Sequence, residues 1–225
     1  MSKLAVIVAG GSGLRMGKEL PKQFLLLEGK PIFLYSIDAF KSTFSDIKIN
    51  LVVPKQYLDY TRDILVNFGY ASNITLIEGG ETRFHSVKNG IADAKPEDIV
   101  FVHDAVRCLV SVALIKKCFD EASSNGSAIP VVPIRDSMRR LADDGSSEVV
   151  KRDRLFSVQT PQTFKAEILL PAFNINYDEK FTDEATVLEN AGHKIFTVTG
   201  EEQNIKITYP DDLLYAKWCL GLRAN

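Results

Sequence analysis

A chain of 225 residues with 45% hydrophobic and 25% charged residues has the composition of an ordinary globular protein. Its formal net charge of −2 argues against a nucleic-acid-binding surface, and no apolar run approaches the roughly 18 residues of a membrane span. Three widely spaced cysteines, with no secretion signal before them, argue against a disulfide framework and a zinc site and favour a cytoplasmic location.

Strand-like and helix-like patterns alternate along the chain. Apolar, β-branched runs predict strands at 4–8, 47–53, 74–77, 99–102, 128–134, 193–198 and 204–208. Amphipathic patterns predict helices at 31–41, 56–68, 82–94, 111–126, 166–173 and 182–190, and from Pro210 onward. This alternation predicts an α/β fold with a Rossmann-like, open, mostly parallel sheet and helices on both faces. We expect residues 1–225 to form one domain.

Residues 137–152 interrupt the alternation. They predict a β-hairpin with its turn near Asp144-Gly145. Because an isolated two-stranded ribbon is only marginally stable in water, we expect this arm to pack against another surface, such as a second subunit. The alternative is a loosely held surface loop.

The first predicted strand leads into a glycine-rich loop with the sequence Ala9-Gly-Gly-Ser-Gly-Leu-Arg-Met-Gly17, followed by Pro21-Lys-Gln23. Glycines let backbone N–H groups approach a phosphate, and Arg15 and Lys22 supply positive charge. The loop does not match the dinucleotide fingerprint, because Met16 stands where its last glycine is needed, nor the P-loop pattern, because Glu19 stands where Ser or Thr is needed. A tight turn with incidental charges is the non-functional alternative.

Three motifs follow directly after predicted strands: the glycine loop, Gly79-Gly-Glu81 and His103-Asp-Ala105. Because the carboxyl ends of parallel strands share one edge of a sheet, we expect these motifs to lie close together. Ligands of open α/β sheets bind at that edge, so the sequence predicts a nucleotide site there.

The residue types fit phosphoryl chemistry without a protein nucleophile. A phosphomonoester has a second pKa of about 6, so it can attack a nucleoside triphosphate as a dianion. Such a site needs cations and a carboxylate for Mg²⁺, for which Asp104 is the candidate. We expect Lys206 to pair with a phosphate or with a carboxylate such as Asp104, Arg107 to face a phosphate, and His103 to be a hydrogen-bonded residue at a strand end.

The glycine loop with Pro21-Lys-Gln23 resembles the signature of sugar-phosphate nucleotidyltransferases. Within that group, five further motifs in order resemble the 2-C-methyl-D-erythritol 4-phosphate cytidylyltransferase family, which uses CTP in non-mevalonate isoprenoid biosynthesis. These motifs are His103-Asp-Ala-Val-Arg107, Ile134-Arg-Asp-Ser-Met138, Thr160-Pro-Gln162, Thr182-Asp-Glu-Ala185 and Asn204-Ile-Lys-Ile-Thr208.

The resemblance implies a role for each matching residue. CTP would be bound by Ala9, Gly10, Gly11, Gly13, Arg15, Lys22, Gly80, Glu81, Ser86, Ala105 and Lys206, of which Gly80, Glu81 and Ser86 would recognise cytosine and ribose. The catalytic residues would be Arg15, Lys22, Asp104 and Lys206, with Mg²⁺ on Asp104. The phosphorylated polyol would be bound by Arg107, Ser137, Arg152 and Thr160. The 137–152 arm would form a homodimer and lend Ser137 and Arg152 to the neighbouring subunit's site.

Three alternatives stay open at this point. The His103–Arg107 motif and the glycine loop are also similar to ribitol 5-phosphate cytidylyltransferase, whereas the residues around Ser137 and Arg152 favour the methylerythritol enzyme. Arg154 lies two residues beyond Arg152, and only the V-x-R-x-x-L spacing selects the earlier arginine. A non-catalytic nucleotide-binding module would not require Lys22, Asp104 and Lys206 together, and a dehydrogenase would require the missing glycine.

Overall fold

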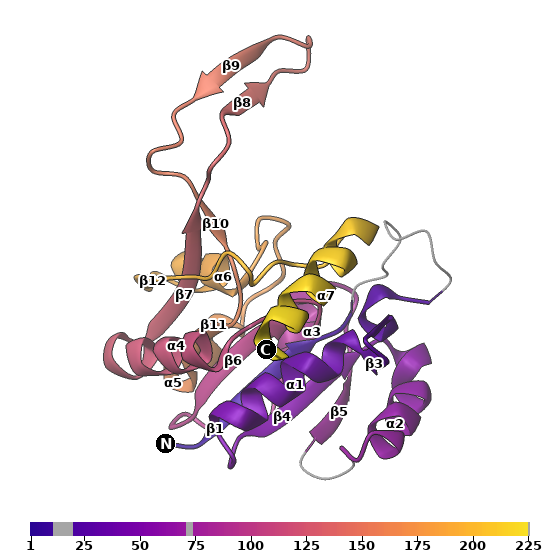
Figure 1. The fold of residues 1–225 in the computed structure, drawn as a ribbon. Helices are drawn as coiled ribbons and strands as arrows, with labels where there is room; N and C mark the ends of the chain where they lie inside the picture. The colour runs from indigo at the N-terminus through magenta and orange to yellow at the C-terminus, as the bar shows by residue number, and fades with distance from the viewer. Residues whose placement is uncertain (11–19, 71–73, 225) are drawn as a thin grey trace.

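The computed structural model describes residues 1–10, 20–70 and 74–224 and confirms the predicted α/β architecture (Figure 1). Its strands are β1 (Lys3–Val8), β2 (Leu26–Leu27), β3 (Lys30–Pro31), β4 (Lys48–Val53), β5 (Ile74–Glu78), β6 (Ile99–Asp104), β7 (Ser127–Pro133), β8 (Met138–Leu141), β9 (Ser147–Val150), β10 (Phe156–Val158), β11 (Gln162–Lys165) and β12 (Thr197–Thr199). Its α-helices are α1 (Ile32–Thr43), α2 (Leu58–Asn67), α3 (Arg83–Gly90), α4 (Val112–Asn125), α5 (Ala166–Ala172), α6 (Glu184–Asn190) and α7 (Pro210–Ala224).

The central sheet has the strand order β10-β7-β11-β6-β1-β4-β5, with β12 paired to β7. The pairs β6–β1, β1–β4 and β4–β5 are parallel, as the alternating pattern predicts. Strand β11 runs antiparallel between β6 and β7, and β10 runs antiparallel to β7. The sheet is therefore mixed but mostly parallel, and its antiparallel strands follow the arm in the sequence.

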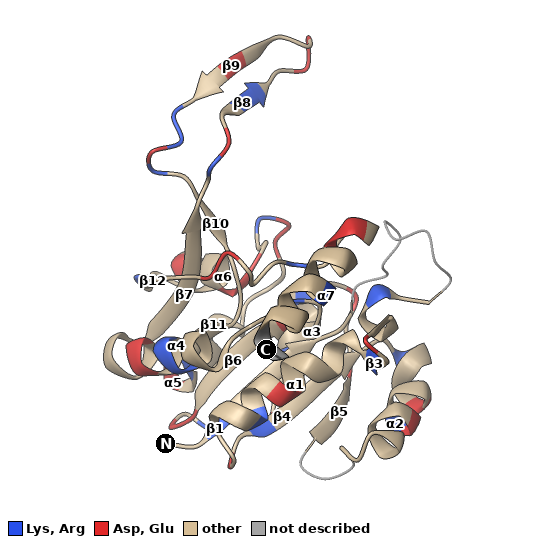
Figure 2. Cartoon of the chain, viewed as in Figure 1, with Lys and Arg blue, Asp and Glu red and all other residues tan. Residues whose placement is uncertain are grey.

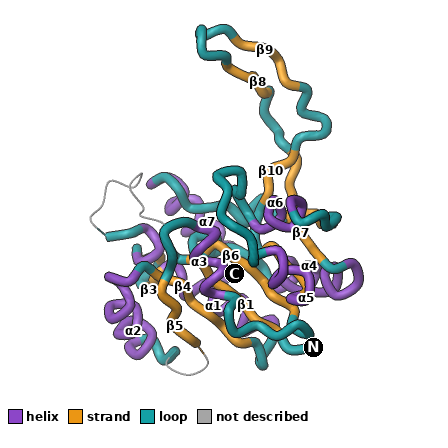
Figure 3. Tube along the Cα trace, turned by 180° about the vertical axis from the view of Figure 1, so that it is seen from behind, coloured by secondary structure: helices purple, strands orange, loops and turns teal. Residues whose placement is uncertain are grey.

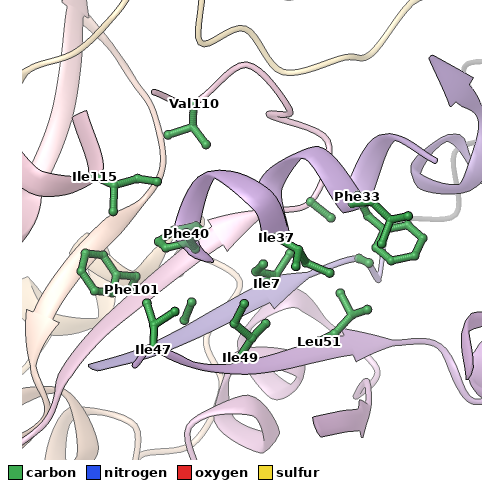
Figure 4. Packing of buried hydrophobic residues seen from close by; sticks show 14 of the residues in the cluster. Ile7, Phe33, Ile37, Phe40, Ile47, Ile49, Leu51, Phe101, Val110 and Ile115 are labelled. Carbon is green, nitrogen blue, oxygen red and sulfur yellow. The ribbon is translucent and has the colours of Figure 1, made fainter. Parts of the chain in front are cut away.

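Two cores lie on opposite faces of the central sheet, and alternate residues of β1 pack into them. Ala5 and Ile7 of β1 face the core under α1, α2 and α4, while Leu4 and Val6 face the core under α3, α5 and α6. Figure 4 shows the first of these cores, with Ile7 and its neighbours on β4 lying below helix α1. Because both faces of β1 are buried, its sequence is a continuous apolar run instead of an alternating one.

The arm projects from the body as a two-stranded hairpin of β8 and β9 (Figures 1 and 3). Gly145 has a φ of 83° at the turn, a left-handed conformation that glycine adopts without strain. Leu141 and Val149 are 75% and 71% exposed, and charges of both signs lie along the arm (Figure 2). The predicted hairpin and its turn are confirmed.

The ends of helix α4 also follow the sequence. The side chain of Ser111 accepts a hydrogen bond from the backbone N–H of Leu114, and Gly126 ends the helix with a φ of 93°. Both residues are where the sequence predicts a cap. Among the described helices, none has the length and apolar character needed to cross a bilayer.

Three predicted elements differ from the structure. The helix predicted at 82–94 ends at Gly90, where a Cβ atom would lie only 2.4 Å from Val6, so the last turn packs directly on the sheet. The strand predicted at 193–198 is limited to Thr197–Thr199. Residues 204–208 form no strand, because Ile207 packs beside α7 and the loop after β6 instead of entering the sheet.

Candidate active site

The carboxyl ends of the parallel strands bring the predicted motifs together at one edge of the sheet. Strand β1 ends opposite Asp104 of β6, and the backbone N–H of Ala105 donates to Val8. The N–H groups of Ala9 and Gly79 donate to consecutive residues of β4. The glycine loop, the 79–81 motif and the 103–105 motif therefore begin side by side, as expected from the sequence.

Asp104 is the centre of charge at this edge. Its side chain is 11% exposed and lies among three cations. Lys206 Nζ is 2.9 Å from Oδ2, Arg107 Nε is 3.6 Å from Oδ2, and Arg83 Nη2 is 3.4 Å from Oδ1. The predicted pairing of Lys206 with Asp104 is confirmed, although Lys206 lies on an irregular segment and its side chain is 42% exposed.

These cations decide the ionisation of Asp104. Burial alone would raise its pKa, but the neighbouring positive charges outweigh burial and hold the pKa well below its usual value. The carboxylate is therefore ionised throughout the neutral range. Burial also disfavours the charged form of Arg107. It lowers the pKa of this guanidinium, although the nearby Asp104 carboxylate partly opposes the shift.

Thr160 and His103 hold the backbone of Asp104. The hydroxyl of Thr160 accepts the N–H of Asp104 at 3.0 Å and lies 3.0 Å from Nδ1 of His103. His103 Nε2 lies 3.2 Å from the carbonyl of Arg107. A neutral His103 protonated on Nε2 satisfies all these partners, because Thr160 then donates to Nδ1. These hydrogen bonds near the end of β6 confirm the interpretation of His103 as a hydrogen-bonded strand-end residue, and burial lowers its pKa to about 4.

Lys22 and Gln23 bind two segments of this edge through hydrogen bonds to backbone carbonyls. Lys22 is buried, and its Nζ donates to the carbonyl of Ile207 at 2.7 Å, one residue after Lys206. Gln23 Nε2 donates to the carbonyl of Ala9 at 2.6 Å. Lys22 thus contacts the chain segment that carries Lys206, as a shared site requires.

The loop between β5 and α3 closes tightly on the side chain of Ser86. The backbone N–H of Gly80 donates to Ser86 Oγ at 3.1 Å, and a Cβ on Gly10 would lie 3.6 Å from the same oxygen. A Cβ on Gly80 would lie 2.3 Å from the Cβ of His85, so only glycine fits there. Ser86 and Gly80 therefore lie beside the start of the glycine loop, and Glu81 is exposed next to them.

The residues predicted for the polyol phosphate fall into two groups. Thr160 and Arg107 lie at Asp104, where Arg107 donates to the carbonyls of Asn204 at 2.8 Å and Val158 at 3.2 Å. Ser137 and Arg152 are exposed at the base of the arm, and Arg152 donates to the carbonyl of Arg135. Within this chain, Ser137 and Arg152 therefore belong to the arm, whereas Thr160 and Arg107 belong to the cluster around Asp104.

Part of the predicted site lies outside the described residues. Gly11, Gly13 and Arg15 belong to this part, and the roles implied for them stay predictions.

Two side chains at this edge had no role in the sequence prediction. Arg83 contacts both Asp104 and Glu184, and Glu184 is 1% exposed. Arg83 lies two residues after the Gly79-Gly-Glu81 motif and Glu184 belongs to Thr182-Asp-Glu-Ala185, but the two residues are 101 positions apart in the sequence. The available signal was their opposite charge, together with the position of Arg83 beside a motif that was predicted at this edge.

Comparisons with known proteins agree with the geometry. A family model described as 2-C-methyl-D-erythritol 4-phosphate cytidylyltransferase matches residues 3–221. Proteins of that name from Phocaeicola vulgatus and Bacteroides fragilis are 42% and 43% identical to this chain, over 96% of it and 99% and 98% of their own length.

Solved structures give the same result. A 4-diphosphocytidyl-2C-methyl-D-erythritol synthase from Anaerococcus prevotii has a TM-score of 0.81 at 28% identity, covering 98% of each chain. A 2-C-methyl-D-erythritol 4-phosphate cytidylyltransferase from Francisella tularensis has a TM-score of 0.80 at 31% identity, covering 97% of this chain and 99% of its own. Motifs, fold and relatives together place this chain in the 2-C-methyl-D-erythritol 4-phosphate cytidylyltransferase family.

Proposed function

We propose that the chain transfers the cytidylyl group of CTP to 2-C-methyl-D-erythritol 4-phosphate and releases pyrophosphate, a step of non-mevalonate isoprenoid biosynthesis. The observation that carries this proposal is that Lys206 pairs with Asp104 where β1 and β6 end, while Lys22 binds the backbone of the residue after Lys206. A module that only binds nucleotides would not need the three together. Family membership supports the choice of substrates.

The reaction needs alignment and charge neutralisation more than proton transfer. The substrate phosphate is largely a dianion at pH 7, since its second pKa is about 6. One of its oxygens attacks the α-phosphorus of CTP in line, the new P–O bond forms, and the bond to the bridging oxygen of pyrophosphate breaks. Lys22 and Lys206 would reduce the repulsion between the two anions and stabilise charge on the leaving group.

Lys206 is suited to change partners when CTP binds, because its side chain is partly exposed and its ammonium group pairs with Asp104. An incoming phosphate offers a second anionic partner on the exposed side. In the proposed mechanism Lys206 turns from the carboxylate to the phosphates when CTP binds, and Asp104 then has an oxygen free of that contact. Gly80, Glu81 and Ser86 would hold the base and ribose from the neighbouring loop.

Mg²⁺ is the cofactor that the family resemblance implies, and Asp104 fits it. Mg²⁺ in nucleotide sites commonly takes one or two carboxylates and completes its shell with phosphate oxygens and water. Within the described ranges, no group of three or more His, Cys, Asp or Glu could hold a metal, so a protein-only site is not offered there. When bound, Mg²⁺ would neutralise charge on the triphosphate. Asp104→Asn should raise the Mg²⁺ concentration needed for half-maximal rate, and an unchanged titration would remove Asp104 as its ligand.

The arm belongs to the proposal as the dimerisation element. Exposed apolar side chains such as Leu141 and Val149 are unfavourable in water and would be covered by a second copy. Ser137 and Arg152 at the base of the arm would then reach the neighbouring subunit's polyol site. Replacing residues 139–149 by a short glycine-serine linker should convert dimers to monomers in sedimentation velocity, and persisting dimers would contradict the proposed role of the arm.

A reducing, cytoplasmic location also stays a proposal. It is supported by the three cysteines, Cys108, Cys118 and Cys219, which are free and buried.

One assay tests the proposed reaction and its alternatives. Pyrophosphate release from CTP is measured with methylerythritol phosphate and, separately, with ribitol 5-phosphate. We expect turnover with the first and little with the second. The reverse preference would make the chain a ribitol phosphate enzyme, and no release with either would support a non-catalytic module.

A further inference from the structure

Glu184 is a buried carboxylate to which the proposed mechanism assigns no role. It is the first residue of α6 and is 1% exposed. Its Oε1 accepts a hydrogen bond from Nη1 of Arg83, and its Oε2 is buried without a hydrogen-bond partner among the residues that the structure describes. Removing a carboxylate from water costs several kcal/mol unless its partners compensate, so its position needs a reason.

Helix capping does not supply that reason. The preceding residue, Asp183, already caps α6, because its carboxylate accepts the backbone N–H of Thr186 and the hydroxyl of Thr186 completes a capping box. The side chain of Glu184 points instead to Arg83 on α3, from a position 101 residues away in the chain. Overall stability is also a weak explanation, since buried ion pairs often contribute little net free energy compared with apolar packing.

Arg83 extends this pair to Asp104. Its Nη2 lies 3.4 Å from Oδ1 of Asp104, which is a long and therefore weak contact. Arg83 is the first residue of α3, where the positive end of the helix dipole disfavours a cation. Burial also disfavours its charge, but the two carboxylates outweigh burial and raise the pKa of Arg83. Arg83 is therefore a fixed cation between Glu184 and Asp104.

One short segment, residues 160–162, fixes the positions of both Asp104 and Glu184. Thr160 holds the backbone of Asp104, and two residues later Gln162 holds the start of α6. Gln162 donates to Asp183 at 2.8 Å and accepts the N–H of Ala185 at 2.9 Å. The carboxylate of Glu184 thus has a defined position relative to the site and does not depend on a loose surface element.

The three cations around Asp104 are anchored differently. Lys206 is the most exposed of them and contacts the carboxylate directly at 2.9 Å. Arg107 is anchored by two backbone carbonyls, which a change of side chain cannot remove. Arg83 is anchored by the side chain of Glu184. Arg83 is therefore the cation whose distance from Asp104 depends on a second side chain.

We propose that Glu184 is a positioning residue that holds Arg83 away from full contact with Asp104, so that the carboxylate stays available to Lys206 and to the nucleotide site. Without the charge of Glu184, Asp104 becomes the stronger anionic partner of Arg83, which would close the 3.4 Å gap and compete with Lys206. This inference rests on the proposed catalytic role of Asp104.

The test replaces Glu184 by glutamine, which keeps its size and an acceptor oxygen but removes its charge. We expect kcat to fall about tenfold, the lower end of the range for residues that orient a functional ligand, while KM for CTP changes by less than about threefold. Glu189→Gln is the matched control, because Glu189 is an exposed glutamate on the same helix. We expect its kcat to be unchanged. If Glu184→Gln does not fold at the assay temperature, Glu184→Asp replaces it, which keeps the charge but withdraws it from Arg83.

A double-mutant cycle separates failure of this inference from failure of the proposed function. If Asp104→Asn leaves kcat unchanged, the proposed role of Asp104 is wrong and the inference falls with it. If Asp104→Asn lowers kcat but Glu184→Gln does not, only the inference is wrong. Where both act, Glu184→Gln should have no further effect in the Asp104→Asn background, and an equal loss in both backgrounds would overturn the inference. If the double variant turns over too slowly to measure, the free energy of unfolding is measured for the same four proteins. Additive losses of this free energy would overturn the inference.

Discussion

The buried His103 predicts a specific loss of stability in mild acid. Its pKa is about 4 in the folded chain, compared with about 6.5 for an unperturbed histidine. As the pH falls below about 6.5, the unfolded chain binds a proton that the folded chain does not bind until about pH 4. The stability that comes from keeping His103 neutral is therefore complete above pH 7 and is lost as the pH falls from about 6.5 to about 4.

The magnitude follows from the difference between the two pKa values. One pKa unit corresponds to about 1.36 kcal/mol, so 6.5 − 4 = 2.5 units give at most about 3 kcal/mol. At pH 5, where 1.5 of these units have been crossed, the loss relative to pH 7 is about 2 kcal/mol. The structure explains this cost mainly by burial, because His103 is fully buried and its charged form would lose contact with water; a proton on Nδ1 would also end the hydrogen bond that Thr160 donates to it.

Two buried carboxylates, Asp104 and Glu184, also change the stability of the chain with pH, and their contributions must be distinguished from that of His103. The pKa of Asp104 is lowered, so the stability that its ionisation provides is lost only below about pH 3.8. Burial raises the pKa of Glu184, although Arg83 partly opposes this shift, so its protonation favours the folded chain as the pH falls. The comparison must therefore be made with a variant that retains both carboxylates.

The assay measures urea unfolding by circular dichroism at pH 7, 6 and 5, without nucleotide and with a metal chelator. Between pH 7 and pH 5 we expect His103→Gln to lose about 2 kcal/mol less stability than the unchanged chain, whatever its stability at pH 7. His193→Gln, at a half-exposed histidine, is the matched control and should follow the unchanged chain. Parallel curves for His103→Gln and the unchanged chain would refute the reasoning.

Three further outcomes are expected. Lys206→Ala and Lys22→Ala should each lower kcat by about 10²–10³ in the pyrophosphate-release assay, because each removes a charge that stabilises the transition state, and a loss confined to KM would mean that these lysines only hold substrate. Gly80→Ala should lower the free energy of urea unfolding by about 1–3 kcal/mol, because the new Cβ lies 2.9 Å from a backbone carbon of α3, whereas Gly10→Ala, with its nearest atom at 3.6 Å, should cost less. An equal cost for both glycines would contradict the close-approach argument. Ser111→Ala removes the cap of α4 and should cost about 1 kcal/mol in the same measurement, so an unchanged midpoint would show that the cap contributes nothing.

Local patterns predicted most elements because the physics behind them is local. The strand at β1 is a continuous apolar run because both of its faces are buried, and Ser111 and Gly126 bound α4 because each satisfies backbone groups of its own helix. The prediction of a strand at 204–208 was wrong because it, too, used only the local pattern. Its apolar residues need burial on one side, and packing on α7 provides that burial as well as a sheet does.

The sequence by itself determined the fold class and the edge at which the motifs meet, and it narrowed the partner of Lys206 to a phosphate or a carboxylate such as Asp104. Each of these follows from patterns within one element or from the rule that parallel strands end at a common edge. Only the tertiary structure decided which other side chains reach Asp104. Arg83 and Glu184 come together across 101 residues, and their contact depends on how α3 and α6 pack on the sheet, which no local pattern encodes.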